Sequence, residues 1–301
     1  MRKIPVGETI SAAYGFAFAG FLSVLGTIWL PTVAFIAFCA GAVFLLVPDL
    51  PRHIMQQDFD SAFFEIARIG GLIWLASLIA RSMMTVGLQE RATGRVQGPT
   101  FFYFSLGAPV WRMIGATILL VLLLLLILIL LVCATGAVAY VAIHFIPRVG
   151  KAVAVIAGIV ATCWFIYAIV RFAFFLPAVV VAENQIGLGR SWELGQGNFW
   201  RIFAVMFVAI VPVAIGLTIV QNAVVGPFLP MGMDSMHIHP GMTPHELLEF
   251  YKSMFKPFLA QIRQAWPFLL ILGIIRDILF LGLANGAIGK AYVAVTQGSS
   301  T

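Results

Sequence analysis

The chain has 301 residues, of which 61% are hydrophobic and 10% are charged, and its mean hydropathy is +1.03. Soluble domains average about 45–50% apolar and 25% charged residues, so this chain has too few charges to cover a water-exposed surface. Its charge-poor runs reach the length of about 20 residues that a helix needs to cross a bilayer. The composition therefore predicts an all-α, polytopic membrane protein, built as one integral membrane domain over residues 1–301.

The net charge of +6 is spread over many loops, which excludes the concentrated basic face of a nucleic-acid-binding protein. All three cysteines, Cys39, Cys133 and Cys163, lie inside apolar runs and form no Cys-x-x-Cys pair. This spacing indicates neither a disulfide framework nor a structural zinc site. The sequence thus predicts membrane lipids as partners, with no nucleic acid and no cofactor.

The N-terminal region contains a charge-free stretch over residues 9–48. As one helix these 40 residues would extend about 60 Å, twice the thickness of the hydrocarbon. We therefore expect an interfacial helix over residues 6–18, with Tyr14 at headgroup level, and a break near Gly20. Pro31 is expected to kink the first crossing.

Apolar windows along the chain predict six membrane spans. They cover residues 22–47, 69–88, 113–143, 154–177, 202–225 and 266–289.

The distribution of Lys and Arg sets the expected orientation. With the N-terminus inside, eight of these residues are cytoplasmic, seven are external and three lie within spans. The loops after the second and fourth spans, the even-numbered loops, are short and carry the basic excess. Seven of the twelve acidic residues fall on the external side of the membrane. We therefore expect both termini in the cytoplasm.

Two patterns recur along the chain. The segment LGAPVWR at residues 106–112 opens the third span, and LGQGNFWR at residues 194–201 opens the fifth. An Ile two residues before an Arg recurs within the second, fourth and sixth spans. This placement predicts three parallel two-helix repeats, over residues 1–96, 97–184 and 185–301.

The recurring arginines are Arg81, Arg171 and Arg276, and Asp277 lies at the same depth. An ionised Arg near mid-membrane costs about 3 kcal/mol even on the lenient insertion scale, so each needs a carboxylate, backbone carbonyls or water. Because Asp277 follows Arg276 directly, its side chain points about 100° away around the helix, which favours Arg81 or Arg171 as its partner. Either two arginines extend to the cytoplasmic face, or the unpaired arginines converge on an anion such as a phospholipid headgroup.

The loop between the fourth and fifth spans combines tryptophans with arginines. Amphipathic aromatic side chains favour headgroup depth, and Arg can pair with lipid phosphate. Ser191 is expected to cap a short helix there. The segment is either an anchor that sets helix depth or a site of specific lipid recognition, and its candidate residues are Glu183, Arg190, Ser191, Trp192, Trp200 and Arg201.

These residues also carry a family resemblance. Arg171 and Pro177, then Glu183, RSWEL at 190–194 and GNFWR at 197–201, resemble the membrane domain associated with glycerophosphoryl diester phosphodiesterases and related six-span bacterial inner-membrane proteins. The match covers about 30 residues, and the number of spans extends it over the chain. At position 195 those proteins usually carry a polar residue, and here a glycine stands. The catalytic domain of the fused members has no counterpart, so the resemblance implies an inner-membrane module without phosphodiesterase activity.

Catalytic and metal motifs are weak. The segment HELLE at 245–249 begins like a zincin helix but has Glu in place of the second His, and no Walker-type loop occurs. We therefore expect no catalytic residue. Met233, Met236, His237 and His239 form a soft-ligand cluster suited to Cu(I), and the alternative is an ordinary loop insertion.

The leading hypothesis is a non-enzymatic inner-membrane module that organises the envelope or membrane through cytoplasmic interfacial helices. The alternative is a transporter or lipid translocator that binds an anion through its intramembrane arginines. A polar cavity lined by the even-numbered spans would favour the alternative.

Overall fold

The computed structural model describes residues 2–46, 59–96, 101–146, 149–225 and 244–297. Within these ranges the chain is helical and contains no strand, which confirms the predicted fold class. The elements are α1 (Val6–Tyr14), a π-helical turn η1 (Gly15–Ala19), α2 (Phe21–Leu46), α4 (Phe59–Ala92), α5 (Ala108–Phe145), α6 (Gly150–Ala173), α7 (Leu176–Ala182), α8 (Leu188–Leu194), α9 (Phe199–Val225) and α10 (Pro244–Thr296).

Six helical stretches are long and apolar enough to cross a bilayer, and each overlaps one predicted span. They are Phe21–Ala42, Phe63–Ala92, Ala108–Phe145, Gly150–Ala182, Phe199–Ala223 and Trp266–Thr296.

The helix that contains the sixth span is longer than the span itself. It begins at Pro244, whereas its apolar stretch begins at Trp266. Proline is favourable in the first turn of a helix, and the Leu and Glu residues that follow are good helix formers.

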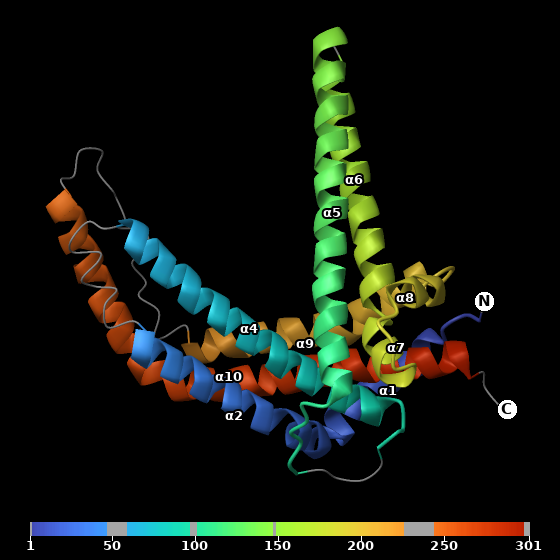
Figure 1. The fold of residues 1–301 in the computed structure, drawn as a ribbon, viewed down its shortest axis with the longest axis horizontal. Helices are drawn as coiled ribbons and strands as arrows, with labels where there is room; N and C mark the ends of the chain where they lie inside the picture. Colours follow the sequence, from blue (N-terminus) through green and yellow to red (C-terminus); the bar gives the residue numbers. More distant parts are fainter. Residues whose placement is uncertain (1, 47–58, 97–100, 147–148, 226–243, 298–301) are drawn as a thin grey trace.

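The helices converge at one end and diverge at the other (Figure 1). The convergent end, which we call the base, consists of α1, η1, α7 and α8 with the adjoining helix ends, and it also holds both termini. From it α5 and α6 rise together as a hairpin arm, while α2, α4, α9 and α10 leave in another direction as a four-helix arm. This arrangement places both termini on one side of the molecule, as six crossings require.

The short helix α7 joins the two arms. Phe175, which precedes α7, and Val179 within it are fully buried against α9 and α10, while Val180 packs with residues of α4 and α5. Above the base the hairpin arm is exposed on most faces, with Leu122 and Leu130 more than half exposed. The packed core therefore lies in the base, and the arms present apolar side chains outward, as helices surrounded by lipid do.

The N-terminal helix packs against the rest of the protein with one face and exposes the other, which includes Glu8 and Ser11. Ala13 and Ala17 are fully buried and pack against Gly286 and Gly282 of α10. Small residues four apart on both helices let the two backbones approach closely. The Tyr14 hydroxyl donates to the Val208 carbonyl of α9 at 3.1 Å.

The predicted break at Gly20 is confirmed. The turn η1 ends at Ala19, and α2 begins at Phe21. A Cβ atom at Gly20 would collide with the Phe16 carbonyl oxygen, so the close turn requires glycine. Pro31 lies inside α2, as expected.

Candidate functional site at the base

Arg171 is the centre of the junction between α6 and α8. Its guanidinium donates to the Tyr167 hydroxyl at 2.7 Å and to the Trp192 carbonyl at 2.6 Å. Its Cζ atom lies 3.8 Å from the centroid of the Trp192 ring, a cation–π geometry. With only 5% of Arg171 exposed, these groups enclose the charge. The structure therefore assigns Arg171 to a protein contact, and not to an anion shared with the other arginines.

Ser191 does not cap a helix start. It lies inside α8, whose N-cap is Gly187. Its hydroxyl is within donating distance of the Arg171 carbonyl at 3.2 Å and the Phe172 carbonyl at 2.8 Å. These carbonyls stand at the C-terminal end of α6, where intrahelical partners are missing. Ser191 thus fastens α8 to the end of α6, where carbonyl acceptors are available.

Asn198 and Arg201 hold the N-terminal segment. The Asn198 side chain accepts from the Ile4 amide and donates to the Arg2 carbonyl, both at 3.1 Å. Arg201 donates to the Ile4 carbonyl at 2.8 Å. The motif that opens α9 therefore binds the start of the chain, while its Trp200 is 76% exposed. Sequence reasoning missed Asn198, because an Asn before a helix is ordinarily interpreted as its own cap.

Glu183 accepts hydrogen bonds from three side chains. Arg190 Nε lies 3.3 Å away, the Tyr292 hydroxyl of α10 3.0 Å and Gln185 Nε2 2.8 Å. Arg190 also reaches Glu193 at 3.3 Å. The hydrogen bond to Glu183 raises the pKa of Arg190 and is the main cause of that shift. Arg190 is therefore paired within the base.

The C-terminal end of α7 is bound by two further arginines. Arg95 donates to the carbonyls of Val181 and Ala182, and Arg112 donates to the Asn184 side chain at 3.2 Å. Guanidinium groups at this position satisfy free carbonyls and complement the helix dipole. Asn184 has a φ of 56°, the left-handed conformation that commonly ends a helix.

The other candidate arginines lie outside this network. Arg81 is exposed and makes no hydrogen bond or ion pair with any residue that the structure describes. Arg276 contacts Asp277 at 3.3 Å, and both side chains are about half exposed, at 54% and 45%. The expectation that Asp277 pairs with Arg81 or Arg171 is therefore wrong. Long side chains can bend along the helix surface, so adjacent residues meet despite their angular separation.

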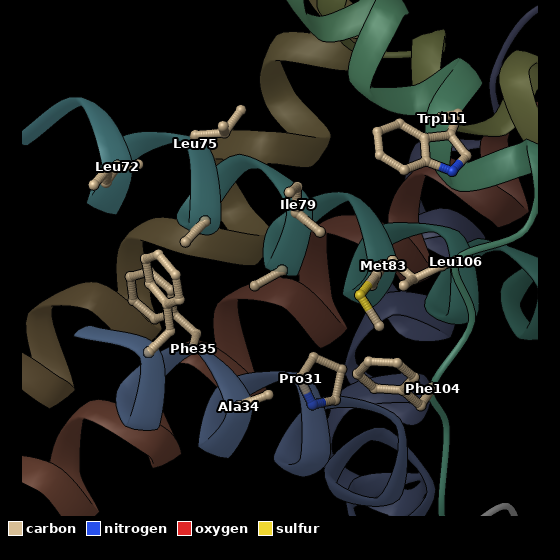
Figure 2. Close-up of a pocket in the computed structure, with 13 residues that line it drawn as sticks. Pro31, Ala34, Phe35, Leu72, Leu75, Ile79, Met83, Phe104, Leu106 and Trp111 are labelled. Atoms are coloured by element: carbon tan, nitrogen blue, oxygen red, sulfur yellow. The ribbon is translucent and has the colours of Figure 1, made fainter. Parts of the chain in front are cut away.

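A groove of about 460 Å³ lies beside the base, between α2, α4 and the start of α5 (Figure 2). Pro31 and Phe35 form its α2 wall, Ile79 and Met83 its α4 wall, and Trp111 closes its α5 end. The lining is apolar throughout, so this groove is not the polar cavity that would favour a transporter.

Comparison of the chain with protein-family models, curated proteins and solved structures finds no match. The resemblance to the membrane domain of glycerophosphoryl diester phosphodiesterases therefore stays a prediction. What the structure adds is a physical reason for the pattern: its Arg171, Ser191 and Trp192 form one packing unit.

The proposed soft-metal cluster of Met233, Met236, His237 and His239 lies outside the described residues. Among the residues described, no three His, Cys, Asp or Glu side chains come close enough together to hold a metal ion.

Proposed function

We propose that this protein is a non-enzymatic module that organises the bacterial inner membrane, with its base and both termini on the cytoplasmic side. The main observation in support of this proposal is that two apolar arms diverge from one interlocked base (Figure 1). A body that is narrower in one leaflet than in the other displaces lipids unequally and favours local curvature. The proposed function is therefore to impose shape or order on the surrounding bilayer.

The chemistry of the base supports this proposal. Arg95, Arg171 and Arg190 are engaged with protein groups, which leaves a fixed platform rather than a set of free reactive charges. Around this platform Trp111 and Trp200 are 57% and 76% exposed. Exposed tryptophans favour the headgroup layer and would set the depth of the base in one leaflet.

An aromatic loop between α4 and α5 adds to this surface. Phe101, Phe102 and Phe104 are each more than half exposed. The loop is held in place, because Trp29 Nε1 donates to the Phe101 carbonyl at 2.6 Å. An exposed apolar loop next to membrane spans fits insertion into the same leaflet as the tryptophans.

Reporter fusions test the orientation. Fusions after Gln97 and Gly187 should report a cytoplasmic location, and fusions after Asp58 and Met242 a periplasmic one, because the even-numbered loops carry the basic excess. Opposite results at all four positions would reverse the proposed orientation.

Reconstitution tests the function. Purified protein is incorporated into vesicles of phosphatidylethanolamine and phosphatidylglycerol, and vesicle shape is measured by electron cryomicroscopy as protein content rises. We expect increasing curvature with the wild type and a weaker effect with Trp111→Ser combined with Trp200→Ser. Trp164→Ser, which changes an exposed tryptophan within the α6 span, is the matched control. Unchanged vesicle shape at every protein content would refute the proposal.

A second candidate function is a lipid translocator or transporter. The observation in its favour is the exposure of Arg81, Arg276 and Asp277 within membrane spans, where ionisable residues commonly mark a pathway. Movement of labelled lipid between leaflets in the same vesicles, without a change in their shape, would select this candidate over membrane organisation.

A further inference from the structure

A buried amide pair fixes the register of α4 and α10. Gln89 Nε2 donates to Asn285 Oδ1 at 2.8 Å, and both residues are almost fully buried. Arg81 lies eight residues before Gln89, and Asp277 lies eight residues before Asn285. Both helices run toward the base (Figure 1), so Arg81 and Asp277 stand at the same level, about 12 Å beyond the amide pair.

Arg81 lies beside the face of α4 that is turned to α10. Met84, three residues later, packs in a cluster with Ile278 of α10. Leu78, three residues earlier, packs in the cluster with α5 and α7. At 100° per residue these neighbours point about 60° to either side of Arg81. Arg81 therefore occupies the strip between the contact with α10 and the contact with the hairpin arm.

Asp277 lies beside the corresponding face of α10. Leu281, one turn later, and Ile278 both pack toward α2 and α4. Leu283 points to the other side, where it packs with α1 and α9. Asp277 thus flanks the contact with α4 at the level of Arg81, and Arg276 joins it through the 3.3 Å contact.

The charges of Arg81, Arg276 and Asp277 do not cancel. Two guanidinium groups and one carboxylate leave a net charge of +1 within two membrane spans. An excess positive charge at this depth requires a counter-anion or water. Arg171 cannot compensate it, because it is a cation and is enclosed by Tyr167 and Trp192.

We propose that Arg81, Arg276 and Asp277 form a binding site for a phosphate group at the contact between α4 and α10. Guanidinium binds phosphate through two parallel hydrogen bonds, and Asp277 orients one of the two cations. The phosphate belongs either to a lipid headgroup or to free phosphate. This site deepens the second candidate function, since it names the ligand, but binding itself requires neither transport nor curvature.

The test measures the phospholipids that co-purify with the protein from vesicles of phosphatidylglycerol and phosphatidylethanolamine. Arg81→Gln should lower the ratio of anionic to zwitterionic lipid about tenfold, as expected when a charge-assisted hydrogen bond is lost. Asp277→Asn should raise it, because the net charge of the three positions increases to +2. Arg68→Gln, an exposed Arg earlier on α4, should leave it unchanged.

Competition identifies the source of the phosphate. Displacement of the bound lipid by inorganic phosphate would assign the site to free phosphate, and retention would assign it to a headgroup. If Arg81→Gln does not fold, Arg276→Gln replaces it, with thermal stability measured in parallel. Equal lipid ratios in all variants, or an equal fall with Arg68→Gln, would overturn the site. Vesicle shape is a separate readout, so failure of the site and failure of the proposed membrane-organising role are distinguishable.

Discussion

Replacement of Arg171 by methionine tests whether this residue holds the base together. The substitution keeps an apolar stem and removes the two hydrogen bonds to Tyr167 and Trp192 and the cation–π contact. Each hydrogen bond to a charged group contributes about 1.5–3 kcal/mol, but removal of a buried charge also recovers a desolvation cost. We therefore expect a net loss of about 2–4 kcal/mol in the free energy of unfolding.

The assay is unfolding by sodium dodecyl sulfate in mixed micelles, followed by tryptophan fluorescence. Arg171→Lys should lose less than Arg171→Met, because it keeps the charge but not the planar fork. A double-mutant cycle with Trp192→Phe should give a coupling of about 1–2 kcal/mol. Arg68→Met serves as the control for removal of an exposed arginine.

Two results would refute this reasoning. Unchanged stability with no coupling would mean that Arg171 does not make these contacts. A fall in co-purified anionic lipid per folded protein, at full stability, would place Arg171 in the anion site after all.

Three other predictions concern the base and the loop between α4 and α5. Gly286→Ala should destabilise the protein by about 1–3 kcal/mol, because its Cβ would lie 2.8 Å from a neighbouring side-chain atom. Gly273→Ala, which has open space around it, should not, and unfolding in detergent compares the two variants. Asn198→Ala should release the N-terminal segment and speed its cleavage in limited proteolysis, and an equal rate with exposed Gln196→Ala would contradict this. Burial, and next the charge of a neighbouring carboxylate, raise the pKa of Tyr103 to about 12 from its ordinary value of 10.0. The stability contributed by its protonated form should be complete below pH 10 and lost as the pH rises to 12, and Tyr103→Phe should remove that step from ultraviolet and unfolding titrations.

Sequence periodicity was sufficient for the membrane spans, because a run of about 20 apolar residues has few alternatives in a chain with so few charges. It also located the break at Gly20, since 40 charge-free residues cannot form one crossing. It did not identify the packing partner of the N-terminal helix. The feature that buries Ala13 and Ala17 is a pair of glycines in α10, more than 260 residues away in the sequence, and local patterns do not report such contacts.

The sequence identified several residues of the candidate site but not the contacts that they make. The sequence singled out Glu183, Arg190 and Ser191, and the structure brings them into one base. Their partners were not foreseen, because a hydroxyl or guanidinium group can satisfy several acceptors and only the packing decides which is near. The same limit applies to Arg171, whose periodic placement with Arg81 implied a shared role that its burial under Trp192 excludes.

The link between the first residues and α9 has a consequence for biosynthesis. The Ile4 amide is bound by a side chain that lies 194 residues later in the chain. At about 5–20 residues per second, a ribosome needs roughly 10–40 s to produce that partner after Ile4 has been made. During that interval two helical hairpins can already enter the bilayer while the Ile4 amide still lacks its Asn198 partner. The last step of assembly therefore involves the first residues to be translated. In a nascent chain released before α9 and α10, these N-terminal residues are expected to stay accessible to quality-control proteases.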